Sequence, residues 1–364
     1  MKKLGFGCMR LPLKVKKING SVDLIKTKEM VDYYLDEGFT YFDTAYMYHD
    51  GRSERSVREA LVSRYERERF ILADKMPVGM LVTKGDTSRI FRHQLKRCGV
   101  EYFDYYLLHA LNAKYLEKAE KLGVFRYLAK KKVEGKIKKL GFSFHDSAEV
   151  LDNILTKHPE MEFVQLQINY LDWEDANVQS RLCYEIARKH GKDIIVMEPV
   201  KGGKLADVPE KVRELFAGEH PDWSPASWAV RFAASLEGVI CVLSGMSDMS
   251  QLRDNTGYMK DFAPLTEKET DIVKKAAAII NNSETIPCTS CRYCTASCPM
   301  NIAIPEYFTA YNKKAGGEEY KTYLEQNAKD KGKADECINC KKCEEVCPQH
   351  ISVTEKLSLV TKTL

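Results

Sequence analysis

The chain has 364 residues, of which 44% are hydrophobic and 30% charged, and this composition excludes a disordered or collagen-like protein. Its 56 Lys and Arg residues nearly balance its 52 Asp and Glu residues, so we expect no nucleic-acid partner. No apolar stretch reaches the roughly 20 residues that cross a bilayer, and the N-terminus lacks the apolar segment of a signal peptide. We therefore expect a cytoplasmic protein with no membrane partner.

Up to about residue 260, the sequence alternates short apolar runs with stretches of helical period, which is typical of repeated βα units. The predicted strands are residues 4–8, 40–43, 70–73, 105–109, 139–143, 163–168, 194–197 and 239–243. The predicted helices are residues 28–37, 54–64, 89–98, 123–134, 148–155, 176–190, 225–236 and 249–258. This alternation predicts an α/β fold, a closed (β/α)8 TIM barrel. An open doubly wound sheet is the alternative, which we disfavour because no Gly-x-Gly-x-x-Gly follows the first strand.

A further predicted helix, at about residues 267–282, leads to the first of two cysteine-rich blocks. We therefore divide the chain into a barrel over residues 1–282 and a small, mainly helical C-terminal domain over residues 283–364. Between the two blocks, helices are predicted over residues 305–315 and over a second stretch that ends near residue 328.

Eight of the twelve cysteines form two blocks with the same spacing, Cys-x-x-Cys-x-x-Cys-x-x-x-Cys-Pro. Three cysteines of such a block hold one cubane, and the fourth ligates the other cluster. The pattern predicts two [4Fe–4S] clusters, one on Cys288, Cys291, Cys294 and Cys347 and the other on Cys337, Cys340, Cys343 and Cys298. Zinc is the alternative, but a tetrahedral zinc needs only four ligands and has no use for the doubled pattern. The blocks resemble dicluster ferredoxins, and the long connection between them is typical of a helical variant.

Four polar residues lie at or just after the ends of three consecutive predicted strands. Asp43 ends the second strand and Tyr48 lies five residues later, while Lys75 and His109 end the third and fourth strands. Each has an ordinary structural explanation when it is taken alone. Because the C-terminal ends of barrel strands meet at one mouth, the four together predict a catalytic site.

The chemistry of these four residues fits the reduction of a carbonyl. Such a reaction needs a proton donor on the oxygen, and a tyrosine with its ordinary pKa of about 10 is a weak acid at neutral pH. We expect the ammonium of Lys75 to lower the pKa of Tyr48, and Asp43 to hold and neutralise Lys75. His109 is predicted to orient the carbonyl oxygen.

Residues 1 to about 262 resemble an aldo/keto reductase. The matching pieces are Leu4-Gly-Phe-Gly-Cys-Met-Arg10, Asp-Thr-Ala-x-x-Tyr-x-x-Gly-x-Ser-Glu from Asp43 to Glu54, Lys75, Leu107-Leu108-His109, Gly141-Phe142-Ser143, Val164-Gln165, Glu198-Pro199 with Gly202-Gly203, and Ser244 to Ser247 with Gln251 and Asn255. The resemblance implies a barrel that binds NADP(H) or NAD(H) in an extended form and transfers hydride directly to or from a carbonyl carbon.

The resemblance also implies a set of cofactor contacts. Ser143 and Gln165 would hold the nicotinamide carboxamide, with Gln167 as an alternative. The loop after Pro199 would pass the pyrophosphate, and the adenosine end would be lined by Gly245, Ser247, Gln251 and Asn255. The full implied set is Gly7, Met9, Asp43, Ser143, Gln165, Gln167, Pro199, Val200, Gly203, Gly245, Ser247, Gln251 and Asn255. In the family an asparagine often stands at Phe144, and at Gln251 an arginine commonly meets the 2′-phosphate, for which Arg253 or Lys201 is the substitute. The choice between NADPH and NADH is therefore left open.

The sequence thus predicts an oxidoreductase enzyme that acts on a small-molecule carbonyl or alcohol, with Tyr46, Trp173 and Trp223 as candidates for a partly aromatic pocket. Hydride carries two electrons whereas each cluster carries one, and no flavin motif is present to divide the pair. The clusters are accordingly structural, regulatory or linked to an external redox protein. The alternative is an electron-transfer or scaffold iron–sulfur protein whose barrel does not turn over.

Overall fold

The computed structural model describes residues 2–15, 20–281, 285–313 and 318–363. Within these residues, eight parallel strands form a closed barrel in sequence order, which confirms the predicted fold class. The strands are β1 Leu4–Gly7, β2 Tyr41–Asp43, β3 Ile71–Met76, β4 Phe103–Leu111, β5 Ile137–Phe144, β6 Phe163–Gln167, β7 Asp193–Met197 and β8 Val239–Ser244. The barrel closes where β1 pairs with β8, with Leu4 opposite Val242.

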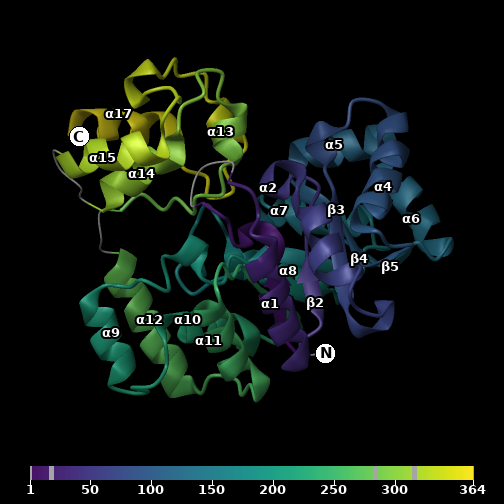
Figure 1. Cartoon of the computed structure of the whole chain (residues 1–364), viewed down its shortest axis with the longest axis horizontal. Helices are drawn as coiled ribbons and strands as arrows, with labels where there is room; N and C mark the ends of the chain where they lie inside the picture. The colour runs from purple at the N-terminus through teal and green to yellow at the C-terminus, as the bar shows by residue number, and fades with distance from the viewer. Residues whose placement is uncertain (1, 16–19, 282–284, 314–317, 364) are drawn as a thin grey trace.

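Helices cover the outside of this barrel (Figure 1). They are α1 Leu24–Asp36, α3 Ser53–Val57, α4 Lys84–Cys98, α5 Ala113–Leu122, α6 Val124–Val133, α7 Ala148–Lys157, α8 Ser180–Lys189, α9 Glu210–Ala217, α10 Pro225–Ser235, α11 Met249–Lys260 and α12 Glu267–Asn281. No helix in the described part of the chain is long and apolar enough to cross a membrane.

The inside of the barrel explains how the polar strand ends are aimed. One layer of buried side chains fills the barrel, and its members are Tyr41, Ala73, Leu107, Phe163, Ile195, Cys241 and Leu243. Because side chains of a strand alternate between its two faces, the residue two positions further on also points inward. Asp43, Lys75, His109 and Gln165 stand in this relation to Tyr41, Ala73, Leu107 and Phe163. The alternation of side chains along the strands therefore places a layer of polar side chains next to the apolar layer, toward the C-terminal ends of the strands.

The C-terminal segment has an apolar cluster of its own. Its helices are α13 Tyr293–Ser297, α14 Ile304–Asn312, α15 Glu318–Asn327, α16 Lys342–Glu345 and α17 Val353–Thr363, so the expected mainly helical character is found. Ile280 packs in the core of the barrel, whereas Ile286 belongs to the second cluster. The domain boundary near residue 283 stays a prediction, since that residue lies outside the described ones. In Figure 1 the C-terminal helices stand beside the barrel, with α13 on the side that faces it.

Candidate active site

A buried lysine links the predicted proton donor to an acid. Lys75 is fully buried, and its Nζ donates a short hydrogen bond to Asp43 Oδ1. The same Nζ donates to Thr44 O at 2.9 Å and lies 3.3 Å from Tyr48 Oη. A buried ammonium is tolerated only where its charge is paired and its protons are bonded, and these contacts meet both needs.

A tight turn aims Tyr48 at this lysine. Tyr48 begins the short helical turn α2, Tyr48–Gly51, in which His49 and Asp50 have left-handed φ angles of 52° and 53°. Leu11 N donates to His49 Nε2 at 3.2 Å, and Arg52 Nε donates to His49 O at 3.0 Å. These contacts stabilise a conformation that residues other than glycine seldom adopt.

His109 completes the group of four. Its ring lies 6.0 Å from the ring of Tyr48, edge to face. Burial, with Lys75 and His145 as further causes, holds the pKa of His109 well below its usual value. The imidazole is therefore neutral at physiological pH, with one nitrogen that can donate and one that can accept. The structure thus brings Asp43, Tyr48, Lys75 and His109 together at one end of the barrel.

One electrostatic expectation is wrong. Lys75 was expected to lower the pKa of Tyr48, but burial, followed by the charge of Asp43, raises the pKa of Tyr48 well above its ordinary value. Desolvation penalises the phenolate more than the neighbouring ammonium favours it. Tyr48 therefore keeps its proton at neutral pH, as a proton donor must.

A buried network behind β3, which the sequence did not reveal, holds the strand that carries Lys75. Gln94 Nε2 donates to Lys75 O at 3.0 Å and to Glu54 Oε1 at 3.1 Å. Glu54 in turn pairs with Arg97 Nε at 2.6 Å. The neighbouring carboxyl of Asp74 is fully buried, so burial raises its pKa well above the usual range. This network links α3 and α4 to the strand.

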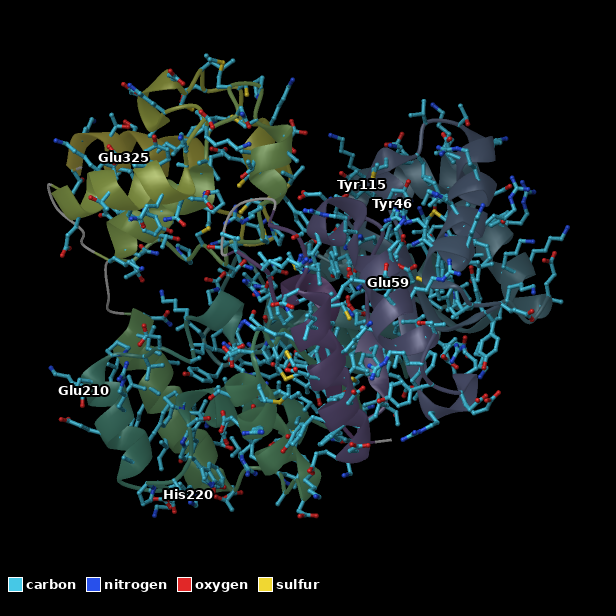
Figure 2. All side chains as sticks on the ribbon, in the orientation of Figure 1. Tyr46, Glu59, Tyr115, Glu210, His220 and Glu325 are labelled. Carbon is cyan, nitrogen blue, oxygen red and sulfur yellow. The ribbon has the colours of Figure 1, made fainter. Side chains whose placement is uncertain are left out.

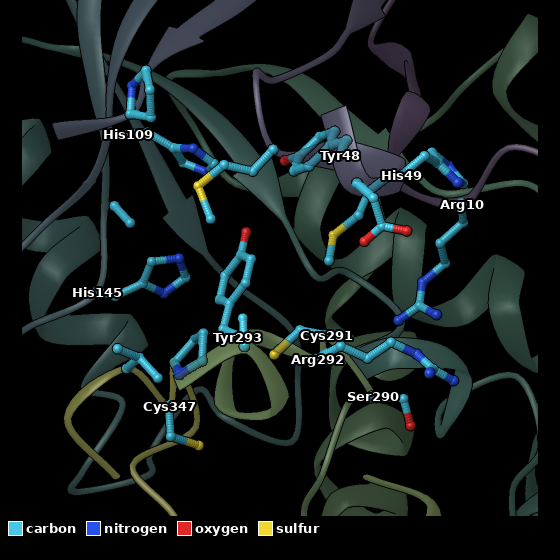
Figure 3. A pocket seen from close by; sticks show the side chains of 18 of the residues that line it. Arg10, Tyr48, His49, His109, His145, Ser290, Cys291, Arg292, Tyr293 and Cys347 are labelled. Atoms are coloured by element: carbon cyan, nitrogen blue, oxygen red, sulfur yellow. The ribbon is translucent and has the colours of Figure 1, made fainter. Parts of the chain in front are cut away.

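The site opens into a cavity of about 1700 Å³ that both domains line. The barrel contributes residues that include Tyr48, His109 and His145 (Figure 3). The C-terminal domain contributes others, among them Cys291, Tyr293, Cys347 and His350. Sequence reasoning missed Tyr293, His145 and His350. Tyr293 could have been found only by asking which way the spacer residues of the first cysteine block point.

The three aromatic residues predicted for the pocket lie elsewhere among the described residues. The ring of Tyr46 packs 6.3 Å from His93 and lies beside the Arg97 guanidinium. Trp173 packs against the core of the barrel. Trp223 stacks on His220, with the rings 3.9 Å apart, and Figure 2 places His220 at the end of the molecule remote from the C-terminal domain. That expectation of an aromatic pocket is therefore wrong for these residues.

The residues expected to contact a nicotinamide cofactor fall into two groups. Met9, Ser247 and Gln251 line the cavity. Ser247 Oγ donates to Arg10 O at 2.9 Å, and Gln251 Oε1 accepts from Ser247 N at 2.8 Å. Arg10 also lines the cavity, whereas Arg253 and Lys201 are not among its lining residues. Arg253 lies over the ring of Tyr33 and Lys201 forms a buried ion pair with Asp172.

The second group does not line the cavity, and four of its members, Ser143, Gln165, Gln167 and Asn255, are buried. Ser143 Oγ accepts from Ala110 N at 2.7 Å, and Gln165 Nε2 donates to Asp43 Oδ2 at 3.2 Å. Asn255 Nδ2 donates to Ser244 Oγ at 2.7 Å. The remaining members are found at the ends of β1, β6, β7 and β8: Gly7, Gln167, Pro199, Val200, Gly203 and Gly245.

The C-terminal domain sits directly on the loop after β7. Gln167 and Gln349 exchange two hydrogen bonds, of 3.1 and 3.0 Å, and Lys201 Nζ donates to Gln349 Oε1 at 3.1 Å. A Cβ placed on Gly202 would lie 2.7 Å from Thr289, so only glycine permits this approach. The loop expected to pass the pyrophosphate thus forms part of the contact between the two domains.

Cysteines of the two blocks lie close enough for their thiols to interact, and the interleaved ligand sets stay a prediction. Burial is the main cause that raises the pKa of Cys294, and the nearby thiols of Cys291, Cys288, Cys347 and Cys343 raise it further. Cys298 and Cys337 likewise raise the pKa of Cys343, after burial, to about 11. Among the described residues, no group of three His, Cys, Asp or Glu side chains is arranged to hold a single metal ion.

The backbone of the two blocks repeats as well. Ser290 and Arg292 have left-handed φ angles of 54° and 67°, and Asn339 and Lys341, at the same places in the second block, have 54° and 57°. Turns of this kind direct successive N–H groups into a concavity that suits an anionic cluster. Ser290 N donates to Cys288 Sγ at 3.4 Å. The blocks therefore fit two cubanes, whose ligand sets remain as predicted from the spacing.

Comparison with known proteins identifies the family. A family model for the aldo/keto reductase family matches residues 3–278, and one for a 4Fe-4S dicluster domain matches residues 287–352. The chain belongs to the aldo/keto reductase family and joins its barrel to a 4Fe-4S dicluster domain. A curated relative, probable aldo-keto reductase 1 of Glycine max, is 27% identical over 209 residues, which cover 55% of this chain and 56% of that protein. The match thus spans little more than half the length of the curated relative.

Solved structures share the fold. An aldo-keto reductase from Bacillus halodurans in its holo form superimposes with a TM-score of 0.60 at 23% identity, covering 75% of this chain and 91% of that one. An aldo/keto reductase from Klebsiella pneumoniae in complex with NADP and acetate gives a TM-score of 0.60 at 18% identity, covering 78% and 92%. At these identities the likeness is one of fold.

Proposed function

We propose that the chain is an NADP(H)- or NAD(H)-dependent enzyme that interconverts a small-molecule carbonyl and its alcohol by hydride transfer. The observation that carries this proposal is the buried Lys75, whose Nζ bonds Asp43 and lies 3.3 Å from Tyr48 Oη. Tyr48 and His109 both line the cavity at this point. Burying a charge costs desolvation free energy, so a buried lysine at this position is expected in an active site and not in a barrel that has lost its activity.

Each of the four side chains has a role in this proposal. Tyr48 donates its proton to the carbonyl oxygen as the carbon is reduced. The Lys75 ammonium stabilises the phenolate that is left, since its N–H already points at the Tyr48 oxygen. Asp43 neutralises Lys75 and so keeps the charge of the buried site low. His109, which is neutral, donates a hydrogen bond that orients the carbonyl oxygen.

A bound nicotinamide would supply the hydride, and NADP is bound by the relative from Klebsiella pneumoniae. We propose that Ser247 and Gln251, which line the cavity together with Arg10, contact its adenosine end with Gly245 and Asn255. Ser143 and Gln165 are proposed for the carboxamide, with Gln167 as the alternative, and Gly7 and Met9 are proposed as contacts at the end of β1. Pro199, Val200 and Gly203 keep their proposed role at the pyrophosphate, although the C-terminal domain already engages this region.

We propose further that the two cysteine sets hold one [4Fe–4S] cluster each and that the protein works in the cytoplasm, with an external redox protein as the electron partner of the clusters. The boundary between barrel and cluster domain is proposed near residue 283. One-electron exchange between nicotinamide and clusters would need such a partner, because hydride delivers two electrons at once.

The test is anaerobic turnover of NADPH or NADH with a panel of aldehydes and ketones, before and after Tyr48→Phe. Loss of the proton donor is expected to lower kcat about 10²- to 10⁴-fold, the usual contribution of general acid catalysis. The iron content and the EPR spectrum of the dithionite-reduced clusters should not change.

Tyr46→Phe is the matched control, because Tyr46 lies two residues away in the same loop but is not among the lining residues of the cavity. It should turn over as the unaltered protein does. A protein that oxidises neither nucleotide with any carbonyl, yet passes electrons through its clusters, would contradict the proposal and favour the electron-transfer or scaffold alternative.

A further inference from the structure

A second phenol, from the cluster domain, faces the proposed reaction centre. Tyr293 lies in the first cysteine block, and its ring centroid is 6.4 Å from that of His109, edge to face. The ring of Tyr48 lies 6.0 Å from the same imidazole, also edge to face. His109 is therefore flanked by one tyrosine from each domain, and Figure 3 shows the Tyr293 hydroxyl pointing into the cavity.

The hydroxyl of Tyr293 is available to a ligand. Tyr293 lines the cavity, and no hydrogen bond from its hydroxyl to a described residue is formed. Tyr48, in contrast, already interacts with Lys75. A half-buried phenol with no hydrogen-bond partner among the described residues gains from a hydrogen-bonding group on the molecule that fills the cavity.

The phenol stands on a helical turn of the first cysteine block. Tyr293 is the first residue of α13 and lies between Cys291 and Cys294, two members of one predicted ligand set. The preceding residue, Arg292, is left-handed and pairs with the buried Glu306 at 2.6 Å. Packing of this kind holds a side chain at the precision that substrate recognition requires.

The domain that carries Tyr293 is also seated firmly on the barrel. Arg10 Nη2 donates to Thr289 O at 2.8 Å, next to the close approach of Thr289 and Gly202. Gln349, which follows the second cysteine block and is 7% exposed, bonds Gln167 and Lys201. Contacts from both cysteine blocks therefore hold the domain that carries Tyr293 against the barrel.

We propose that Tyr293 is a substrate-binding residue and that the substrate carries a second oxygen next to its reacting carbonyl, as a 2-hydroxyketone does. Tyr48 and His109 take the reacting oxygen, and Tyr293 donates a hydrogen bond to the neighbouring oxygen. The cluster domain thus supplies the specificity contact of the barrel's reaction. This inference rests on the proposed function and names the substrate class of the same site.

The experiment compares acetoin with 2-butanone, which differ by one hydroxyl on the carbon beside the carbonyl. In the unaltered protein, kcat/KM for acetoin should exceed that for 2-butanone at least tenfold. Tyr293→Phe should lower kcat/KM for acetoin about 5- to 30-fold, mostly through KM, and change that for 2-butanone less than threefold. Tyr311→Phe, in the same domain but not among the lining residues of the cavity, should leave both values unchanged.

A second readout does not depend on turnover. Without nucleotide, calorimetric binding of acetoin should weaken in Tyr293→Phe by the same factor as KM rises, while iron and sulfide contents stay equal. Equal kcat/KM for acetoin and 2-butanone in the unaltered protein would overturn the inference even if the variant failed to fold. So would a Tyr293→Phe protein with intact clusters and unchanged discrimination. A protein that reduces neither ketone nor any other carbonyl would instead refute the proposed function itself.

Discussion

At the scale of single residues, Lys75 places an ammonium group inside the barrel, where burial of a charge is unfavourable. It is fully buried and depends on Asp43 for its counter-charge. Removing one partner of a buried ion pair leaves the other uncompensated, whereas replacing both by apolar side chains of similar volume is often neutral or stabilising. Replacing one or both members of the pair therefore distinguishes its effect on stability from its role in catalysis.

Lys75→Met is expected to destabilise the fold by about 3–5 kcal/mol, because Asp43 is left as an unpaired buried charge. Adding Asp43→Leu should recover most of this loss without restoring carbonyl reduction. Anaerobic urea unfolding, followed by far-UV circular dichroism, measures both effects. A single variant as stable as the unaltered protein would show that the pair carries no such role.

The sequence was sufficient to predict which polar residues meet at the mouth of the barrel, but it did not predict the direction of the pKa shift of Tyr48. Asp43, Lys75 and His109 were identifiable because inward-facing residues at the C-terminal ends of barrel strands meet at one mouth. The pKa of Tyr48 was predicted in the wrong direction because burial of its hydroxyl depends on what covers the mouth. Tyr293 was missed for the same reason, since its contact with His109 joins distant parts of the chain through domain docking.

At the scale of elements, β5 and β6 approach each other closely at Gly141. Gly141 pairs with Phe163 across these strands, and a Cβ on Gly141 would lie 2.3 Å from Phe163 O and 2.8 Å from its ring. Neither the backbone nor a buried aromatic ring can move without disturbing Ser143 and Gln165, which pair two residues further along the strands. The absence of a side chain at Gly141 thus allows the strand pairing that places Ser143 opposite Gln165.

Gly141→Ala is expected to lower the midpoint of anaerobic thermal unfolding and to weaken nucleotide binding, because an added methyl group forces the strands apart, an overpacking that typically costs about 1–3 kcal/mol. Gly257→Ala is the matched control. Gly257 lies inside α11 with open space around its Cα, so alanine there should stabilise by about 0.5–1 kcal/mol. Equal midpoints for the two variants would contradict this account of the barrel wall.

Periodicity predicted the strands better than it predicted the helices. The helix predicted over residues 54–64 is divided into α3 and a wider turn, Arg58–Val62. The helix α5, Ala113–Leu122, was missed altogether, although Asn112 caps its start and the left-handed Gly123 ends it. Apolar spacing reports which face is buried, whereas these capping residues determine where a helix begins and ends.

At the scale of the whole molecule, the two domains share one cavity and a small number of buried polar contacts. Cys294 and Cys343 belong to the apolar cluster of the C-terminal domain, so the proposed clusters would be part of its core. The barrel has a much larger core of its own. Loss of metal should therefore affect the two domains unequally.

Removal of iron with an anaerobic chelator is expected to speed amide hydrogen exchange across α13, α14 and α17 while the eight strands keep their protection. The surfaces around Gly202 and Gln167 should exchange faster as well, because the C-terminal domain covers them. Reconstitution with iron and sulfide should reverse the change. Unchanged exchange in the C-terminal helices would mean that the cysteines are not structural metal ligands.

The shared cavity wall also sets an order of assembly during synthesis. The barrel precedes the second cysteine block in the chain and therefore leaves the ribosome first. Until Cys347 has emerged and iron has been delivered, the mouth of the barrel lacks the wall that carries Tyr293. With the ligand sets proposed above, a cell short of iron would accumulate finished barrels that cannot recognise their substrate. The iron supply would then determine what fraction of the protein can bind its substrate.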